Sequence, residues 1–196
     1  MRKIAVFASG NGTNFQAIIE HIERGHLEAE VAVLVTDKPD CFAVERANNH
    51  NIPVFAFNPK NYASKGEYEK IIASILIEKE VSLIVLAGYM RLIGEVLLNM
   101  FSNRIINIHP ALLPAFPGKN GVQQAFQYGV KIFGVTVHYV DAGVDTGKII
   151  AQECFKANRT ETLTEIEEKI HTIEHQLYPK VIGEILYFPS EYPGSL

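Results

Sequence analysis

Two short segments of the chain carry side chains that suit acyl-transfer chemistry. Asn107 and His109 stand two residues apart at the end of an apolar run, and Asp145 lies in a glycine-containing loop farther along. An amide and a protonated imidazole donate hydrogen bonds to the oxyanion that forms when an amine attacks an acyl carbon. A neighbouring carboxylate, for which Asp145 is the candidate, raises the imidazole pKa and keeps the cation populated. If Asp145 meets His109 in space, these residues form an acyltransferase site.

The spacing of the first pair indicates a shared direction. In an extended strand Asn107 and His109 point to the same face, and Pro110 ends the strand so that His109 lies at its rim. Open α/β sheets bind ligands at such carboxyl ends. The alternative is a pair of strand-end side chains bonded to neighbouring backbone. Asp141 is a competing carboxylate, and the segment around Asp145, taken alone, is better explained as a turn.

Residues 9–14, Ser-Gly-Asn-Gly-Thr-Asn, separate the first apolar run from the first helical pattern. Amides at a helix N-terminus and the helix dipole favour an anion, so this loop is predicted to bind a phosphate ester. A dinucleotide site and a plain tight turn are the alternatives. Asp37 stands where a ribose-binding acid would follow the second strand, but Asn14 or Phe15 replaces the third glycine of that fingerprint.

Two further features have both functional and structural explanations. Residues 88–93, after the fourth apolar run, offer backbone groups and apolar side chains to a flat heterocycle, or form a simple strand-to-helix turn. A metal site built from His109, His138 and Asp145 lacks a compact ligand motif. We therefore expect no metal and interpret His138 as a structural neighbour.

The composition predicts one globular domain. The chain has 196 residues, 47% hydrophobic and 20% charged, and we expect a single domain over 1–188 with a loose tail at 189–196. A formal net charge of −4 does not indicate a basic surface for nucleic acid or an anionic membrane, which favours small-molecule substrates. Cys41 and Cys154 fit no metal or redox spacing, and no signal peptide is evident, so we expect free thiols and a cytoplasmic location.

The apolar pattern predicts the elements that hold these residues. Short, mostly continuous apolar runs, typical of strands buried on both faces, occur at residues 4–8, 31–36, 54–57, 83–87 and 104–108. Amphipathic stretches of helical length, including 14–24 and 65–80, lie between most of them. The alternation predicts an α/β fold with a doubly wound, mostly parallel sheet.

The pattern changes after residue 109. A proline-containing loop and a short helix near 122–128 lead to two long apolar runs, 132–140 and 148–155. The connection between these runs is short enough for antiparallel pairing. A long C-terminal helix is predicted over 162–186, with Pro179 as the position where a kink is expected.

Seven segments spread over nearly the full length match the motifs of one known family. They are residues 9–14, 86–91, 107–114, 116–118, 137–140, 145–147 and 174–179. With them the chain resembles the phosphoribosylglycinamide formyltransferase family, folate-dependent enzymes of purine synthesis with a Rossmann-like fold. The Asn-x-His-Pro-x-Leu-Leu-Pro block is specific for folate-type formyltransferases. The opening loop and the Glu-His-x-x-Tyr-Pro block point to the glycinamide ribonucleotide branch.

The resemblance implies that a formyl group passes from 10-formyltetrahydrofolate to the amine of 5-phosphoribosylglycinamide. It implies catalytic roles for Asn107, His109 and Asp145, with His109 as the proton donor and Asp145 raising its pKa. Contacts to the substrate phosphate and ribose are implied for Gly12, Thr13, Asn14 and Glu174. Folate contacts are implied for Lys65, Met90, Arg91, Leu92, Ile93, Asn107, Asp141, Ala142, Gly143, Val144 and Asp145.

Three positions depart from the family pattern. Lys65 stands where arginine is frequent, Asn120 where histidine is frequent, and His171 where glutamine is common. Because lysine and arginine are not equivalent in binding carboxylates, the folate contact at Lys65 is expected to differ. The resemblance leaves a monomer or a homodimer open, with small-molecule substrates and without nucleic acid, membrane or metal.

Three rival functions share parts of this pattern. Formyl transfer to methionyl-tRNA would bring a C-terminal RNA-binding domain and a basic surface, whereas one helix and a short tail follow residue 155. Hydrolysis of formyltetrahydrofolate uses the same catalytic groups with water as the acceptor. A non-catalytic binder of phosphorylated metabolites would keep the phosphate loop alone. We favour direct attack by the amine, since no serine or cysteine nucleophile stands beside His109.

Overall fold

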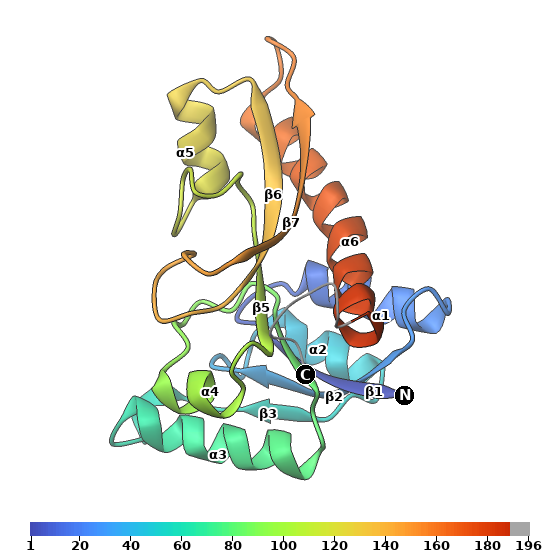
Figure 1. Ribbon diagram of the computed structural model, residues 1–196, viewed down its shortest axis with the longest axis vertical. Helices are drawn as coiled ribbons and strands as arrows, with labels where there is room; N and C mark the ends of the chain where they lie inside the picture. The colour runs from blue at the N-terminus through green and yellow to red at the C-terminus, as the bar shows by residue number, and fades with distance from the viewer. Residues whose placement is uncertain (189–196) are drawn as a thin grey trace.

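The computed structural model describes residues 1–188 of the 196-residue chain, so the predicted tail at 189–196 lies outside the described residues. Within residues 1–188, seven strands form one sheet in the order β3-β2-β1-β4-β5-β6-β7 (Figure 1). The strands are β1 (Arg2–Phe7), β2 (Ala29–Thr36), β3 (Val54–Ala56), β4 (Leu83–Leu86), β5 (Ile105–His109), β6 (Ile132–Tyr139) and β7 (Ile149–Lys156). The helical elements are α1 (Thr13–Glu23), α2 (Phe42–Asn49), η1 (Pro59–Asn61), α3 (Lys65–Glu78), α4 (Glu95–Met100), α5 (Gly121–Tyr128) and α6 (Leu163–Tyr187).

The sheet changes direction at β5. Strands β3, β2, β1, β4 and β5 pair in parallel, whereas β6 runs antiparallel to β5 and β7 antiparallel to β6. The predicted α/β fold, with a mostly parallel sheet, antiparallel late strands and a long C-terminal helix, is therefore confirmed. The change of direction brings the loop between β6 and β7 to the carboxyl ends of the parallel strands, where ligands bind in open α/β sheets.

Apolar side chains alternate between two cores, one on each face of the sheet. Along β1, Ile4 and Val6 belong to the first core, and Ala5 and Phe7 belong to the second. The first core is covered by α1, α2, α5 and α6, and the second by α3 and α4. Burial on both faces explains why the central strands are continuous apolar runs.

Helix α6 joins the two parts of the sheet. Its N-terminus carries a capping box between Thr162 and Glu165, which satisfies backbone amides that the helix leaves free. Tyr178, fully buried, donates its hydroxyl to the carbonyl oxygens of Leu86 in β4 (2.8 Å) and Ile106 in β5 (3.2 Å). Pro179 lies within the helix, which continues to Tyr187. Figure 1 shows α6 running beside β6 toward the parallel strands.

Some element boundaries differ from those that the apolar pattern predicts. Strand β5 includes His109, which pairs with Thr136 of β6, so His109 is the last residue of the strand and not the first beyond it. The short helices α2 and α4 carry few buried apolar residues, and the apolar pattern predicts neither of them. No helix within residues 1–188 is long and apolar enough to cross a membrane.

Candidate functional site

A groove of about 960 Å³ opens at the carboxyl ends of the parallel strands. It is lined by the loop before α1, the segment after β4, the end of β5 and the loop after β6. Of the site residues expected from the sequence, all except Lys65 and Ala142 are among the described residues that line it. The groove therefore gathers segments that are far apart in the chain into one continuous surface.

The three candidate catalytic residues meet in the groove. His109 Nδ1 lies 3.3 Å from Asp145 Oδ2, and Asn107 Nδ2 lies 3.4 Å from Asp145 Oδ1. Asn107 and His109 are alternate residues of β5 and share one face, as the spacing predicts. The side chain of His109 is 5% exposed and that of Asp145 is 13% exposed, so water screens their interaction weakly.

Both ring nitrogens of His109 face oxygen atoms that accept hydrogen bonds. Nε2 lies 2.8 Å from the carbonyl oxygen of Phe116, and Nδ1 faces the Asp145 carboxylate. A carbonyl oxygen and an ionised carboxylate accept hydrogen bonds and donate none. Each ring nitrogen is therefore positioned to donate a hydrogen bond when it carries a proton.

The Asp145 carboxylate is held in its ionised form. Burial alone would raise the pKa of Asp145, but hydrogen bonds from His138 and the Gly118 amide and the charge of His109 bring it below its ordinary value. The Gly118 amide donates to Oδ2 over 2.7 Å. Asp145 has a φ of 55°, a left-handed conformation in which aspartate is one of the more tolerated residues. The carboxylate is thus a fixed negative charge beside the imidazole.

Glycine is required where the Asp145 loop closes. A Cβ atom added at Gly147 would lie 1.7 Å from the carbonyl oxygen of Tyr139, so a side chain at this position cannot be accommodated without moving the loop. Asp141 caps the same loop, since its Oδ1 accepts hydrogen bonds from the Gly143 amide (3.0 Å) and the Thr146 hydroxyl (2.7 Å). One oxygen of the competing carboxylate is therefore engaged within its own loop.

His138, which the sequence analysis interprets as a structural neighbour, contacts the same hydrogen-bonded group. It pairs with Asn107 across the β5–β6 ladder, and its Nε2 lies 3.2 Å from Asn107 Nδ2 and 3.5 Å from Asp145 Oδ1. Its Nδ1 donates to the Tyr139 carbonyl oxygen over 2.8 Å, which fixes the ring. The alternation of polar residues along β6 was the available signal.

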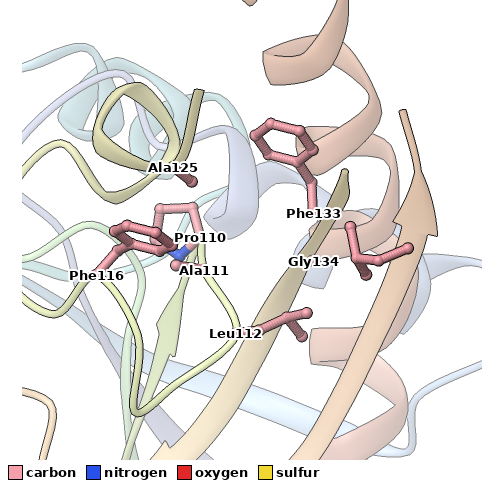
Figure 2. Close-up of a pocket in the computed structure, with 8 residues that line it drawn as sticks. Pro110, Ala111, Leu112, Phe116, Ala125, Phe133 and Gly134 are labelled. Carbon is pink, nitrogen blue, oxygen red and sulfur yellow. The ribbon is translucent and has the colours of Figure 1, made fainter. Parts of the chain in front are cut away.

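The loop after β5 is anchored by a buried threonine. Thr136 of β6 donates its hydroxyl to the Ala111 carbonyl oxygen (2.7 Å) and accepts from the Leu113 amide (3.0 Å). Figure 2 shows the apolar cavity behind this loop, where residues that follow β5 face α5 and β6. This cavity, of about 20 Å³, has room for a single water molecule and not for a substrate.

The other end of the groove has the features of a phosphate site. Helix α1 begins after Gly12, which has a φ of 72°, and no side chain among the described residues caps its first amides. Asn14 Nδ2 donates to Glu174 Oε2 over 3.1 Å, and His171 Nδ1 lies 3.0 Å from the same oxygen. Lys38, which sequence reasoning did not single out, also lines the groove.

The segment after β4 lines the groove with apolar side chains. Met90 is 59% exposed and Leu92 is 57% exposed, while Ile93 packs into the second core. The Arg91 side chain is engaged in an ion pair, its Nε 2.9 Å from Asp37 Oδ2. Lys65 is exposed at the first turn of α3, and its predicted folate contact stays a prediction. Within residues 1–188, no group of three or more His, Cys, Asp or Glu side chains is arranged to hold a metal ion.

Comparison with known proteins shows the family. The family model described as formyl transferase matches residues 2–182. The chain is 53% identical over 186 residues to a phosphoribosylglycinamide formyltransferase of Bacillus subtilis, with 95% of each chain covered. It is 38% identical to the enzyme of the same name from Haemophilus influenzae, which covers 93% of this chain and 86% of that protein.

Solved structures agree with both the fold and the family. The crystal structure of phosphoribosylglycinamide formyltransferase from Bacillus halodurans superposes with a TM-score of 0.92 at 49% identity, over 97% of this chain and 98% of that one. Glycinamide ribonucleotide transformylase 1 from Geobacillus kaustophilus also gives 0.92, at 51% identity, over 95% and 99%. The chain therefore belongs to the formyl transferase family and, within it, to the phosphoribosylglycinamide formyltransferases.

Proposed function

We propose that the chain transfers a formyl group from 10-formyltetrahydrofolate to the amine of 5-phosphoribosylglycinamide, by direct attack of the amine. The observation that carries the proposal is the position of His109, held between Asp145 and the Phe116 carbonyl within the groove. The phosphate loop lies at one end of this groove and the apolar segment after β4 lines another part of it. Both substrates therefore have a surface from which they reach the same three side chains.

The reaction begins when the amine lone pair attacks the formyl carbon. The carbonyl electron pair moves to oxygen, and a tetrahedral oxyanion forms. Asn107 Nδ2 and the imidazolium of His109 donate hydrogen bonds to this oxyanion, while Asp145 balances the charge of His109. The attacking nitrogen loses a proton and N10 of the folate gains one. The carbonyl then forms again as the bond from carbon to N10 breaks, so no covalent enzyme intermediate is needed.

One hydrogen bond of the loop after β5, from His109 to the Phe116 carbonyl oxygen, must break for this step. In the structure the hydrogen on His109 Nε2 is taken by the Phe116 carbonyl oxygen. We place the formyl oxygen at the position of that carbonyl, where it accepts the same hydrogen bond. Catalytic hydrogen bonds in unliganded enzymes often form fully only when substrate is bound. Binding of the donor is therefore coupled to a local shift of the Phe116 main chain.

The two substrates bind at separate surfaces. The phosphate accepts hydrogen bonds from the amides of Gly12, Thr13 and Asn14, where the dipole of α1 favours an anion. Glu174 orients Asn14 and approaches the ribose side of the substrate. The pterin lies against Met90, Arg91, Leu92 and Ile93 on one side and the loop 141–145 on the other. This loop carries Asp141, Ala142, Gly143, Val144 and Asp145.

The test is an assay of formyl transfer with the purified protein. The donor is 10-formyltetrahydrofolate, the acceptor is 5-phosphoribosylglycinamide, and both the loss of donor and the formation of formylated acceptor are measured. We expect donor loss that requires the acceptor and matches product formation one to one. Donor loss without the acceptor would indicate hydrolysis instead. Tight binding of the ribonucleotide without donor loss would indicate a non-catalytic binder, and either result would overturn the proposal.

A further inference from the structure

Asp37 stands where a ribose-binding acid stands in dinucleotide enzymes, but its carboxylate has other partners here. Its side chain is 6% exposed. Ser9 Oγ donates to Oδ1 over 2.5 Å, and Arg91 Nε donates to Oδ2 over 2.9 Å. Both carboxylate oxygens accept hydrogen bonds from the protein, and Asp37 is not among the described residues that line the groove. These contacts indicate a role for Asp37 other than binding a ribose.

Ser9 connects Asp37 to the segment after β4. While its hydroxyl donates to Asp37, the same oxygen accepts a hydrogen bond from the Met90 amide over 2.9 Å. The Ser9 amide donates to the Gly88 carbonyl oxygen over 3.1 Å, and Ser9 is 3% exposed. The hydrogen bonds of Asp37 with Ser9 and Arg91, together with that from the Met90 amide to Ser9, are here called the Asp37 brace. The brace contacts both the main chain and a side chain of residues 88–94.

The far end of residues 88–94 is held by a second carboxylate. Glu69 of α3, which is 2% exposed, accepts a hydrogen bond from the Gly94 amide over 2.6 Å through Oε1. Between the two anchors, Met90 and Leu92 expose more than half of their side chains in the groove. Ile93 packs into the second core, but the exposed Met90 and Leu92 add little burial, so the hydrogen-bonded anchors help to hold the segment.

We propose that Asp37 is a positioning residue that holds residues 88–94 in the conformation that receives the pterin of the formyl donor. The proposal rests on the proposed function of the groove. Asp37 touches neither substrate, and it acts through the Ser9 hydroxyl and the Arg91 guanidinium. Preorganisation of a binding segment lowers the cost of ordering it when the ligand arrives. Loss of the brace should therefore weaken donor binding and leave the phosphate end of the groove intact.

The principal test is Asp37→Asn. The asparagine oxygen still accepts from Ser9, but its amide group places a donor opposite the Arg91 donor, so the ion pair is lost with little change of shape. We expect the Kd for tetrahydrofolate to rise about tenfold, as for loss of a hydrogen bond between charged groups. The Kd for 5-phosphoribosylglycinamide should change less than about twofold, since no contact at Asn14 is touched.

The matched control is Asp40→Asn. Asp40 is exposed in the same connection between β2 and α2 and carries the same charge, so its removal tests for a general electrostatic effect. We expect tetrahydrofolate binding to be unchanged in this variant. An unchanged tetrahydrofolate Kd in Asp37→Asn, or equal weakening of both ligands, would overturn the role of Asp37. Failure of the unaltered protein to bind tetrahydrofolate would instead count against the proposed function.

Amide hydrogen exchange gives a readout that needs no ligand. The Met90 amide donates to Ser9 Oγ, so its exchange should accelerate in Asp37→Ala, which removes the acceptor that orients the Ser9 hydroxyl, while amides of α6 keep their rates. Slow exchange at Met90 in this variant would contradict the brace even if the folate assay failed. In a double-mutant cycle, Asp37→Asn with Arg91→Gln should bind tetrahydrofolate no more weakly than the worse single variant. If the tetrahydrofolate Kd of the double variant rises by the product of the two single increases, the two side chains act independently.

Discussion

The two ends of the groove differ in how far their hydrogen-bonding groups are already satisfied. At the catalytic end, His109, Asn107 and Asp145 all have partners within the protein. At the phosphate end, the first amides of α1 have no side-chain cap and Asn14 Oδ1 is buried without a hydrogen-bond partner among residues 1–188. Under the proposed function, an anion would fill the open positions at the phosphate end, whereas the reaction would exchange existing partners at the catalytic end. Changes at the two ends should therefore affect different kinetic constants.

The largest effect is expected from Asp145→Asn at the catalytic end. The amide keeps the shape of the loop but removes the charge that faces His109 and adds donors where acceptors are needed. Because one oxyanion donor is worth about 3 kcal/mol, kcat should fall by about a hundredfold or more. Steady-state kinetics with both substrates saturating measures this loss. Binding of 5-phosphoribosylglycinamide by calorimetry should stay within about twofold, since Asn14 and Glu174 are unchanged.

A near-normal kcat for Asp145→Asn would show that the Asp145 carboxylate does not support catalysis. Asp141 would then be the carboxylate to test, although in the structure its Oδ1 is engaged by Gly143 and Thr146. A fall in the thermal midpoint parallel to the fall in kcat would indicate a structural role for Asp145 instead. Circular dichroism of the same preparation distinguishes the two explanations.

Glu174→Gln should give an intermediate effect at the phosphate end. Glu174 is 4% exposed, and its carboxylate accepts from Asn14 while facing His171, so the amide disturbs both contacts. The KM for 5-phosphoribosylglycinamide should rise about tenfold, as for loss of a hydrogen bond to a charged group, with kcat within about twofold. Initial rates over a range of ribonucleotide concentrations measure both constants. If kcat falls as far as it does in Asp145→Asn, the two ends of the groove do not affect separate kinetic constants.

The smallest effect concerns two stacked histidines of α6 near the phosphate end. The hydrogen bond to Glu174 raises the pKa of His171 above 6.5, whereas burial lowers the pKa of His175 below that value. Their rings lie 6.2 Å apart between centroids. A pH titration followed by NMR should therefore give a higher midpoint for His171 than for His175. Equal midpoints would contradict the distinct surroundings of the two rings.

These two shifts have opposite consequences for stability. The stabilising contribution of His171 is complete below pH 6.5 and is lost as the pH rises through its raised pKa. That of His175 is complete above pH 6.5 and is lost as the pH falls through its lowered pKa. In Glu174→Gln the midpoint of His171 should fall, because the carboxylate that raises it is gone. Thermal midpoints across this pH range check the sign of each contribution.

The elements that the sequence predicts well are those with a strong local pattern. Strands β1, β2 and β4 are continuous apolar runs because helices cover both of their faces, and α6 has apolar residues at helical spacing. Helix α2 buries only Ala43 and Ala47, and α4 has six residues, so neither is long or apolar enough to produce a periodic signal. Prediction from apolar periodicity fails where the buried surface is small.

In the candidate site too, some features follow from the local sequence and others depend on tertiary contacts. The pairing of Asn107 with His109 follows from strand geometry, and the anion loop follows from its place before α1. The contacts of His138 with Asn107 and Asp145 are not predictable from the sequence, because they depend on the register between β5 and β6 and on the shape of the loop after β6. No local pattern encodes that register or the left-handed conformation at Asp145.

Alternation along a strand and the position of a helix N-terminus are local properties, so the amino-acid sequence alone indicates which chemical groups stand at the ends of which strands. Which of these groups meet depends on the tertiary structure. Asn107 reaches Asp145 across 38 residues, and Asn14 reaches Glu174 across 160. Hydrogen bonds depend on distances of a few tenths of an ångström and on angle, and these are set by packing of the sheet against its helices.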